Sequence, residues 1–171
     1  SKLISKKQDM AISGVHQIAF RSAVHEVRED LYIARKDLDR AIQIIERGKE
    51  PFSDSEWERV TIACDHIDHL LEEIPEFYDT ENHLYIIDQR RESVIVEAVH
   101  RTLARLVTFI ETIEKRPSNF QDHPETKASI MKIAATGQRL IPEWDRRSPH
   151  RGSVDFADIG LLISRIEKVP V

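Results

Sequence analysis

The chain has 171 residues, of which 40% are hydrophobic and 32% are charged, and its formal net charge is −5 at pH 7. This length and balance suit one globular domain with a sizeable core and exclude a disordered chain. The acidic excess provides no general attraction to nucleic acid or to anionic membranes, so we do not expect a nucleic-acid partner.

The apolar runs, the single cysteine and the first residue indicate where the protein is located and how far its domain extends. No apolar run reaches the roughly 18 residues of a membrane-spanning helix, and a single cysteine excludes an internal disulfide framework. Both features fit a cytoplasmic protein. The first residue is Ser rather than Met, which is typical of a processed product or an excised domain. We expect one helical domain over residues 1–171, with residues 1–14 as a leading segment that the pattern does not assign.

A long helix is predicted from Phe20 onward. Its apolar residues recur at alternating spacings of three and four positions, which is typical of one buried stripe. The stripe comprises Phe20, Val24, Val27, Leu31, Ala34, Leu38, Ala41 and Ile45. Gly48 and Pro51 favour a helix end, and Ser13 with Gly14 favours a break between this helix and a short leading one.

A second helix is predicted after Ser53. Ser53 is suited to cap the helix, and Glu56 is placed to reach back to the Ser53 backbone, so the two residues make a capping box. The expected stripe is Trp57, Val60, Cys64, Ile67, Leu71 and Ile74. Pro75 restricts Ile74 and predicts the end of the helix.

A third helix is predicted from a cap at Asp79 or Thr80 to about Lys115. Its main stripe comprises Leu84, Ile87, Val94, Ala98, Leu106, Phe109 and Ile113, and a second set comprises Val96, Val99, Leu103, Val107 and Ile110. Together the two sets make the C-terminal half of the helix apolar around most of its circumference, so we expect this helix to be central.

The last part of the chain predicts two more helices. Asp122 and Glu125 form a capping-box pattern for a fourth helix, which we expect to end by Pro142. A loop follows, and Ser153 or Asp155 is placed to cap a short final helix. The apolar residues of that helix are Phe156, Ile159, Leu162, Ile163 and Ile166. The whole pattern predicts an all-α, mostly antiparallel bundle of four or five principal helices, with long first and third helices.

Potential metal ligands cluster in the segment CDHIDHLLEE, residues 64–73, within the second predicted helix. On a helical wheel His69 points nearly opposite the apolar stripe and His66 lies at its flank, so we predict a solvated face and expect no metal or cofactor. The alternative is a surface metal site of His66, His69 and Glu73 that another helix or subunit completes. Cys64 lies on the stripe and is predicted to be a core residue.

The segment DRRSPHRG, residues 145–152, is basic within an acidic chain. Its cationic side chains are Arg146, Arg147, His150 and Arg151. Because a connector of this composition is exposed to solvent, we predict a recognition surface for an acidic partner or a phosphate group. A solvated connector is the alternative.

The segment RPSNFQDH, residues 116–123, places Arg116 seven residues before His123. This spacing resembles that of small helical ribonucleases of the HEPN class, in which an Arg and a His are directed at RNA phosphate. The chain departs from the family's usual setting because Pro117 follows the Arg and Pro124 follows the His. The resemblance implies a ribonuclease as an alternative function.

Surplus apolar residues on the first helix carry the main functional prediction. These residues lie outside the stripe of the first helix and are Tyr32, Ile33, Ile42 and Ile44.

No set of catalytic groups stands out in the sequence, so an enzyme is the less favoured class. His25 and His100 lie off the stripes of their helices and are predicted to be surface residues.

The apolar surface of these four residues on the first helix must be buried against another helix or against a partner. We therefore predict a non-enzymatic interaction or regulatory bundle that binds a protein partner or self-associates. A metal- or ligand-binding bundle and a HEPN-like ribonuclease remain open as alternatives.

Overall fold

The computed structural model describes the backbone of residues 2–74, 78–79, 84–85, 88–148 and 159–171, and the side chains of residues 14–74, 88–148 and 159–171. The described helices are α1 (Lys2–Arg47), α2 (Asp54–Glu73), α3 (Gln89–Glu114), α4 (Pro124–Arg147) and α5 (Ile159–Glu167). Two short strands, β1 (Tyr78–Asp79) and β2 (Leu84–Tyr85), pair antiparallel between α2 and α3, and the 3-10 turn η2 (Pro117–Asn119) precedes α4.

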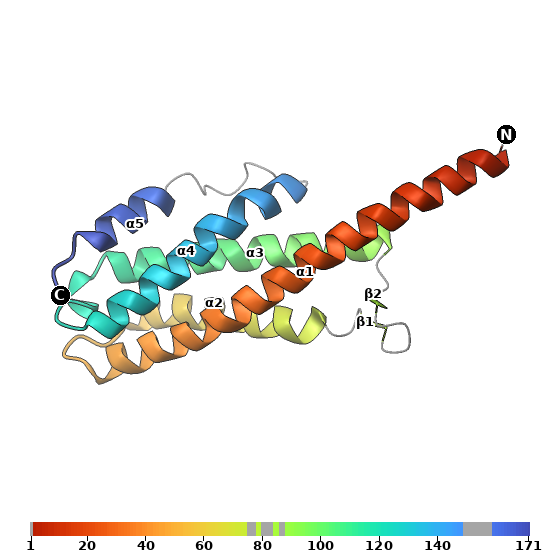
Figure 1. Ribbon diagram of the computed structural model, residues 1–171. Helices are drawn as coiled ribbons and strands as arrows, with labels where there is room; N and C mark the ends of the chain where they lie inside the picture. The colour runs from red at the N-terminus through yellow and green to blue at the C-terminus, as the bar shows by residue number, and fades with distance from the viewer. Residues whose placement is uncertain (1, 75–77, 80–83, 86–87, 149–158) are drawn as a thin grey trace.

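Helices α1 to α4 form an antiparallel bundle in which successive helices run in opposite directions (Figure 1). Helix α1 packs against α2 and α4, and α3 packs against the same two helices. Helix α5 covers α3 and α4. The predicted all-α, mostly antiparallel bundle is therefore confirmed, and so is the central position of α3.

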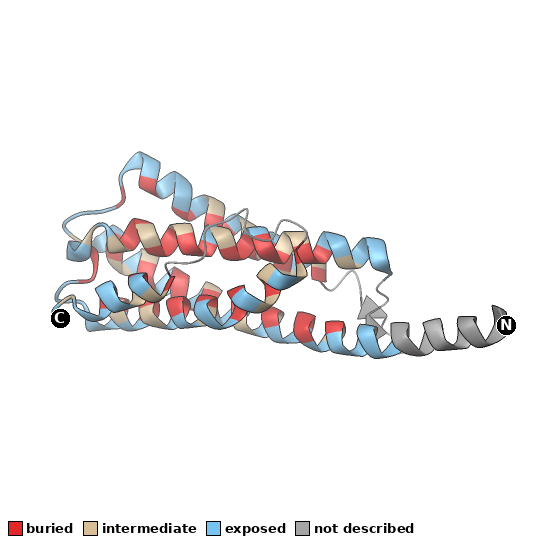
Figure 2. Cartoon of the chain, turned by 90° about the horizontal axis from the view of Figure 1, so that it is seen from above, coloured by how far each residue is buried: buried red, intermediate tan, exposed pale blue. Residues whose placement is uncertain are grey.

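The core lies along the faces of the helices that point toward one another (Figure 2). The stripe predicted on α1 is buried from Phe20 to Ile45. The buried stripe of α2 differs from the prediction, because Leu70 is buried while Trp57 is exposed and Leu71 is only half-buried. Helix α2 contacts both α1 and α3, so its buried arc is wider than one stripe and is centred between these neighbours.

The predicted break near Gly14 is wrong, because α1 is one continuous helix of 46 residues. A glycine inside a helix costs only about 1 kcal/mol relative to alanine, which is too little to interrupt a helix supported on its C-terminal side. At 1.5 Å per residue α1 is about 70 Å long. Its N-terminal end extends beyond the neighbouring helices (Figure 1).

The predicted start of the third helix is also wrong. Asp88 is the N-cap of α3, and its carboxylate accepts a hydrogen bond of 2.8 Å from the backbone N–H of Arg91. Asp79 and Leu84, which we expected at the cap and in the first turns, pair with each other between β1 and β2. Short apolar runs are compatible with a strand or a helix, and the periodicity of Leu84 and Ile87 did not distinguish them. Thr80 and Ile87 lie outside the described residues.

Both predicted ends of the fourth helix need correction. Its N-cap is His123 without a side-chain cap, and Asp122 adopts a left-handed conformation with φ 67° in place of the expected capping role. The helix continues through Pro142 to Arg147. A proline removes one backbone hydrogen bond, but the next turn is held by Trp144, which is fully buried.

The final helix α5 begins at Ile159, and its buried residues Ile159, Leu162 and Ile166 agree with the prediction. The residues expected to start it, Ser153, Asp155 and Phe156, lie outside the described part of the chain.

The capping box at the start of α2 is confirmed and generates a stability prediction. Glu56 accepts a hydrogen bond of 3.0 Å from the Ser53 N–H, and it also forms an ion pair with Arg116. Burial alone would raise the pKa of Glu56, but hydrogen bonds with Ser53 and the charge of Arg116 lower it below its usual value. A carboxyl with a depressed pKa stabilises the folded state above its unfolded pKa, and this contribution is lost as the pH falls through the folded value.

We therefore expect Glu56→Gln to lower the free energy of unfolding by about 1–2 kcal/mol at pH 7. The difference from the wild type should shrink as the pH falls from the ordinary pKa of a glutamate carboxyl through the lowered pKa of folded Glu56, because the wild-type carboxylate then becomes protonated. Urea unfolding followed by circular dichroism at several pH values measures both effects. A loss of stability that stayed constant from pH 7 to pH 3 would contradict the assigned role of the charge.

Candidate functional site

The outer face of α1 carries exposed apolar side chains. Val15, Ile18, Tyr32 and Ile33 retain 70%, 63%, 48% and 55% of their accessible surface. At 100° per residue all four point away from the buried stripe. Of the residues predicted for this face, Ile42 instead packs partly against the core and Ile44 is half-buried. Val15 and Ile18 were missed because they precede the buried stripe, next to the expected break.

The polar residues between these apolar pairs define the rest of the surface. His25 and Glu29 are exposed and lie between the two pairs. The Lys36 ammonium lies 4.5 Å from the centre of the Tyr32 ring. We call the set Val15, Ile18, His25, Tyr32 and Ile33 the outer α1 face.

The basic segment 145–152 is only partly a loop. Arg146 and Arg147 belong to the last turn of α4, so their predicted place in a connector is wrong. Arg147 bonds Glu143 at 3.0 Å, and its guanidinium lies over the rings of Phe20 and Trp144, at 5.6 and 5.5 Å. Arg147 therefore supports the packing of α4 on α1. Arg146 is exposed, with its Nε donating to the Pro142 carbonyl at 3.2 Å.

His150 and Arg151 lie outside the described residues. A recognition role for the four cationic residues of this segment stays a prediction.

A small cavity of about 240 Å³ lies between α2 and α3. It is lined by His66, His69, Leu70, Glu73, Val94, Ala98, Arg101 and Thr102, and we call it the α2–α3 groove. His69 and Glu73 form a pair at 2.8 Å on the solvent side, with His69 largely exposed. His66 is half-buried and lies near Arg101 and Arg105 of α3.

The alternative metal site of His66, His69 and Glu73 finds no completing ligand in this groove. Among the described residues, no group of three His, Cys, Asp or Glu side chains is placed to hold a metal ion. The charged residues of α3 that act on His66 are Arg101 and Arg105, whose positive charges oppose the binding of a cation. Burial lowers the pKa of His66, and the positive charges of Arg105 and Arg101 lower it further.

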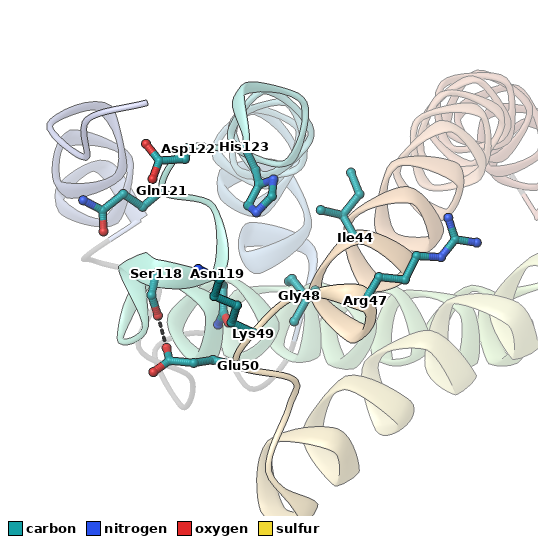
Figure 3. Close-up of a pocket in the computed structure, with 11 residues that line it drawn as sticks. Ile44, Arg47, Gly48, Lys49, Glu50, Ser118, Asn119, Gln121, Asp122 and His123 are labelled. Atoms are coloured by element: carbon teal, nitrogen blue, oxygen red, sulfur yellow. Dashed lines mark hydrogen bonds between the residues drawn. The ribbon is translucent and has the colours of Figure 1, made fainter.

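A second cavity, of about 580 Å³, lies at the end of the bundle where α1 ends and α4 begins. His123 and Ile44 project toward the same space from α4 and α1 (Figure 3). Asn119 lies at the edge of the cavity with 5% of its surface exposed, and neither its Oδ1 nor its Nδ2 has a hydrogen-bond partner in the described structure. Both amide atoms are shielded from solvent, so this amide costs stability without presenting itself to a ligand.

The two residues that resemble the HEPN pair are held differently from each other. Arg116 pairs with Glu56 and also donates to the Pro51 carbonyl at 3.3 Å. His123 lines the end cavity, whose lining does not include Arg116 among the described residues. The engagement of Arg116 with the capping box of α2 gives it a structural role.

A buried histidine joins α3 to α4. His100 retains 5% of its surface, and its Nε2 lies 3.2 Å from Asp145 Oδ1. The prediction that His100 is a surface residue is therefore wrong, because α3 is buried around more of its circumference than its stripes indicate. His25 is exposed, as predicted.

Comparison with protein families, with curated proteins and with solved structures finds no match to this chain. Within the described residues, no helix combines the length and apolar character needed to cross a bilayer.

The lone thiol generates a chemical prediction. Burial raises the pKa of Cys64 to about 11, although the positive charge of Arg35 acts in the opposite direction. Because the thiolate is the reactive species, we expect iodoacetamide at pH 8 to modify native Cys64 roughly 100-fold more slowly than the urea-unfolded chain. Mass spectrometry of timed samples measures the rates. Similar rates in the two states would place Cys64 outside the core.

Proposed function

We propose that the protein is a non-enzymatic interaction module that self-associates through the outer α1 face. The observation that carries this proposal is the exposure of four large apolar side chains on the side of α1 that no other described helix covers. Exposed apolar surface that is collected on one helix face favours association with another helix. The lone buried thiol fits a reducing compartment, and we place the protein in the cytoplasm.

The occupant that fits this face is a second copy of the same chain. The apolar residues form two pairs, Val15 with Ile18 and Tyr32 with Ile33, and His25 lies close to the midpoint between them. In an antiparallel two-fold arrangement, the first pair of one copy meets the second pair of the other. A two-fold interface must be complementary to itself, and this spacing satisfies that condition.

The length of α1 supports the same occupant. Helix α1 has 46 residues, whereas its bundle neighbours α2 and α4 have 20 and 24. A helix gains most of its stability from packing an apolar face, so a segment that extends past its neighbours is stabilised by a partner helix. Self-association would supply that partner for the residues near Val15 and Ile18.

We expect the wild type to be dimeric at micromolar concentration and Ile18→Lys/Ile33→Lys to be monomeric, as measured by sedimentation equilibrium. Both positions are exposed and lysine is a good helix former, so helical signal and Tm should be retained. Thr61→Lys/Ala135→Lys is the control, since it adds the same charge at exposed positions of α2 and α4. A wild type that stays monomeric would refute the proposal. If the α1 variant and the control dissociated equally, the loss of the dimer would be due to the added charge and not to the outer α1 face.

The antiparallel arrangement has its own test. Replacement of His25 by cysteine places two thiols near the two-fold axis, where disulfide geometry can be met. We expect mild oxidation to link His25→Cys into a covalent dimer, while Gln43→Cys, which lies far from the axis, stays monomeric on a non-reducing gel. Faster linkage of Gln43→Cys would exclude pairing about His25.

A further inference from the structure

Two arginines at or beside the α2–α3 groove are not used by the fold. Arg101 lines the groove, and Arg105 lies one turn farther along α3, near enough for its charge to act on His66. Both are exposed, and in the described part of the chain neither guanidinium has a hydrogen-bond or salt-bridge partner. Most other arginines with a structural role here are paired, as Arg35 is with Asp68 at 2.8 Å. Two arginines at this spacing repel each other weakly in the absence of a counter-charge.

His66 faces the same two arginines from α2. The groups that act on its charge are Asp65 and His69 from its own helix and Arg101 and Arg105 from α3. Glu73 also lines the groove but is paired with His69 at 2.8 Å. The half-buried imidazole therefore shares the groove with Arg101 and is acted on by the charge of Arg105. A bound anion would supply a counter-charge for both arginines and for the protonated imidazole.

The size of the groove limits the ligand. Its volume of about 240 Å³ is smaller than the roughly 300–1,000 Å³ of pockets that hold drug-sized molecules. It is suited to one compact group with several acceptor oxygens. Arginine guanidinium groups bind such oxyanions through paired N–H donors.

We propose that the α2–α3 groove binds a phosphate-class dianion, held by Arg101, Arg105 and His66. The ligand is either free phosphate or the phosphoryl group of a small monoester, and both present the same oxygens. This inference concerns a surface other than the outer α1 face and does not depend on self-association.

Binding of the dianion is linked to protonation of His66. An adjacent negative charge favours the imidazolium form, so binding raises the pKa of His66 and is tighter at pH 6 than at pH 8. Sulfate isolates this linkage because its own charge is constant over that range. Phosphate and a small phosphate monoester then distinguish the free ion from the ester.

The experiment is an NMR titration of the His66 imidazole with sodium sulfate, against sodium chloride at equal ionic strength. We expect sulfate to raise the pKa of His66 by about half a unit or more relative to chloride. In Arg101→Gln/Arg105→Gln the sulfate response should disappear, and the pKa of His66 in chloride should be higher than in the wild type because two positive charges are gone. Repeating the titration with phosphate and with glycerol phosphate shows which source binds more tightly.

The matched control is Lys115→Gln/Lys132→Gln, which removes two exposed charges outside the groove and should keep the full sulfate response. Exposed charges contribute little to stability, so both double variants should keep the wild-type circular dichroism spectrum. If the groove variant fails to fold, the single Arg105→Gln variant should give a reduced response. An equal response in the groove variant and the control, or none in the wild type, would overturn the proposal.

Discussion

The burial of α3 around most of its circumference is the constraint on which the rest of the structure depends. Leu103, Leu106, Phe109, Ile110 and Ile113 are all fully buried, so α3 needs neighbours on several sides. Helices α2, α4 and α5 supply them. The first helix closes the bundle against α2 and α4 and receives no comparable cover. Apolar residues on the far side of α1 are therefore left exposed, and this exposure is the reason we propose that helix as the surface for association.

The same arrangement explains which polar side chains of α3 have a partner on a neighbouring helix and which do not. Because α3 packs closely against two helices that carry ionisable residues, some of its polar side chains lie within the contacts. His100 is buried against Asp145 of α4, while Arg101 and Arg105 lie beside His66 of α2. The first contact is satisfied by a direct pair. The second places two exposed arginines without a partner in the described structure beside a half-buried histidine, which is why we propose that an anion binds there.

The sequence predicts the features that depend on local periodicity and capping. The α1 stripe and the Ser53–Glu56 capping box were both predicted, since each requires only residues within a few turns. Features set by distant contacts were not predictable. Helix α4 passes Pro142 because Trp144 packs edge-to-face on Phe20 of α1, with ring centres 6.0 Å apart. The arginines near His66 belong to another helix, so the pattern of α2 alone left a surface metal site open as an alternative and could not include their positive charges.

The two proposed surfaces are independent because of the order of helices in the bundle. The outer α1 face points away from the core, whereas the described residues that line the α2–α3 groove belong to α2 and α3 and none belongs to α1. A partner docked along α1 therefore leaves Arg101 and Arg105 accessible. The net charge also shows that anion binding would depend on local groups. The chain as a whole carries −5 and repels anions at long range. An oxyanion is held at the groove only because two arginines and a histidine act over a few ångströms, where local charges outweigh the screened net charge.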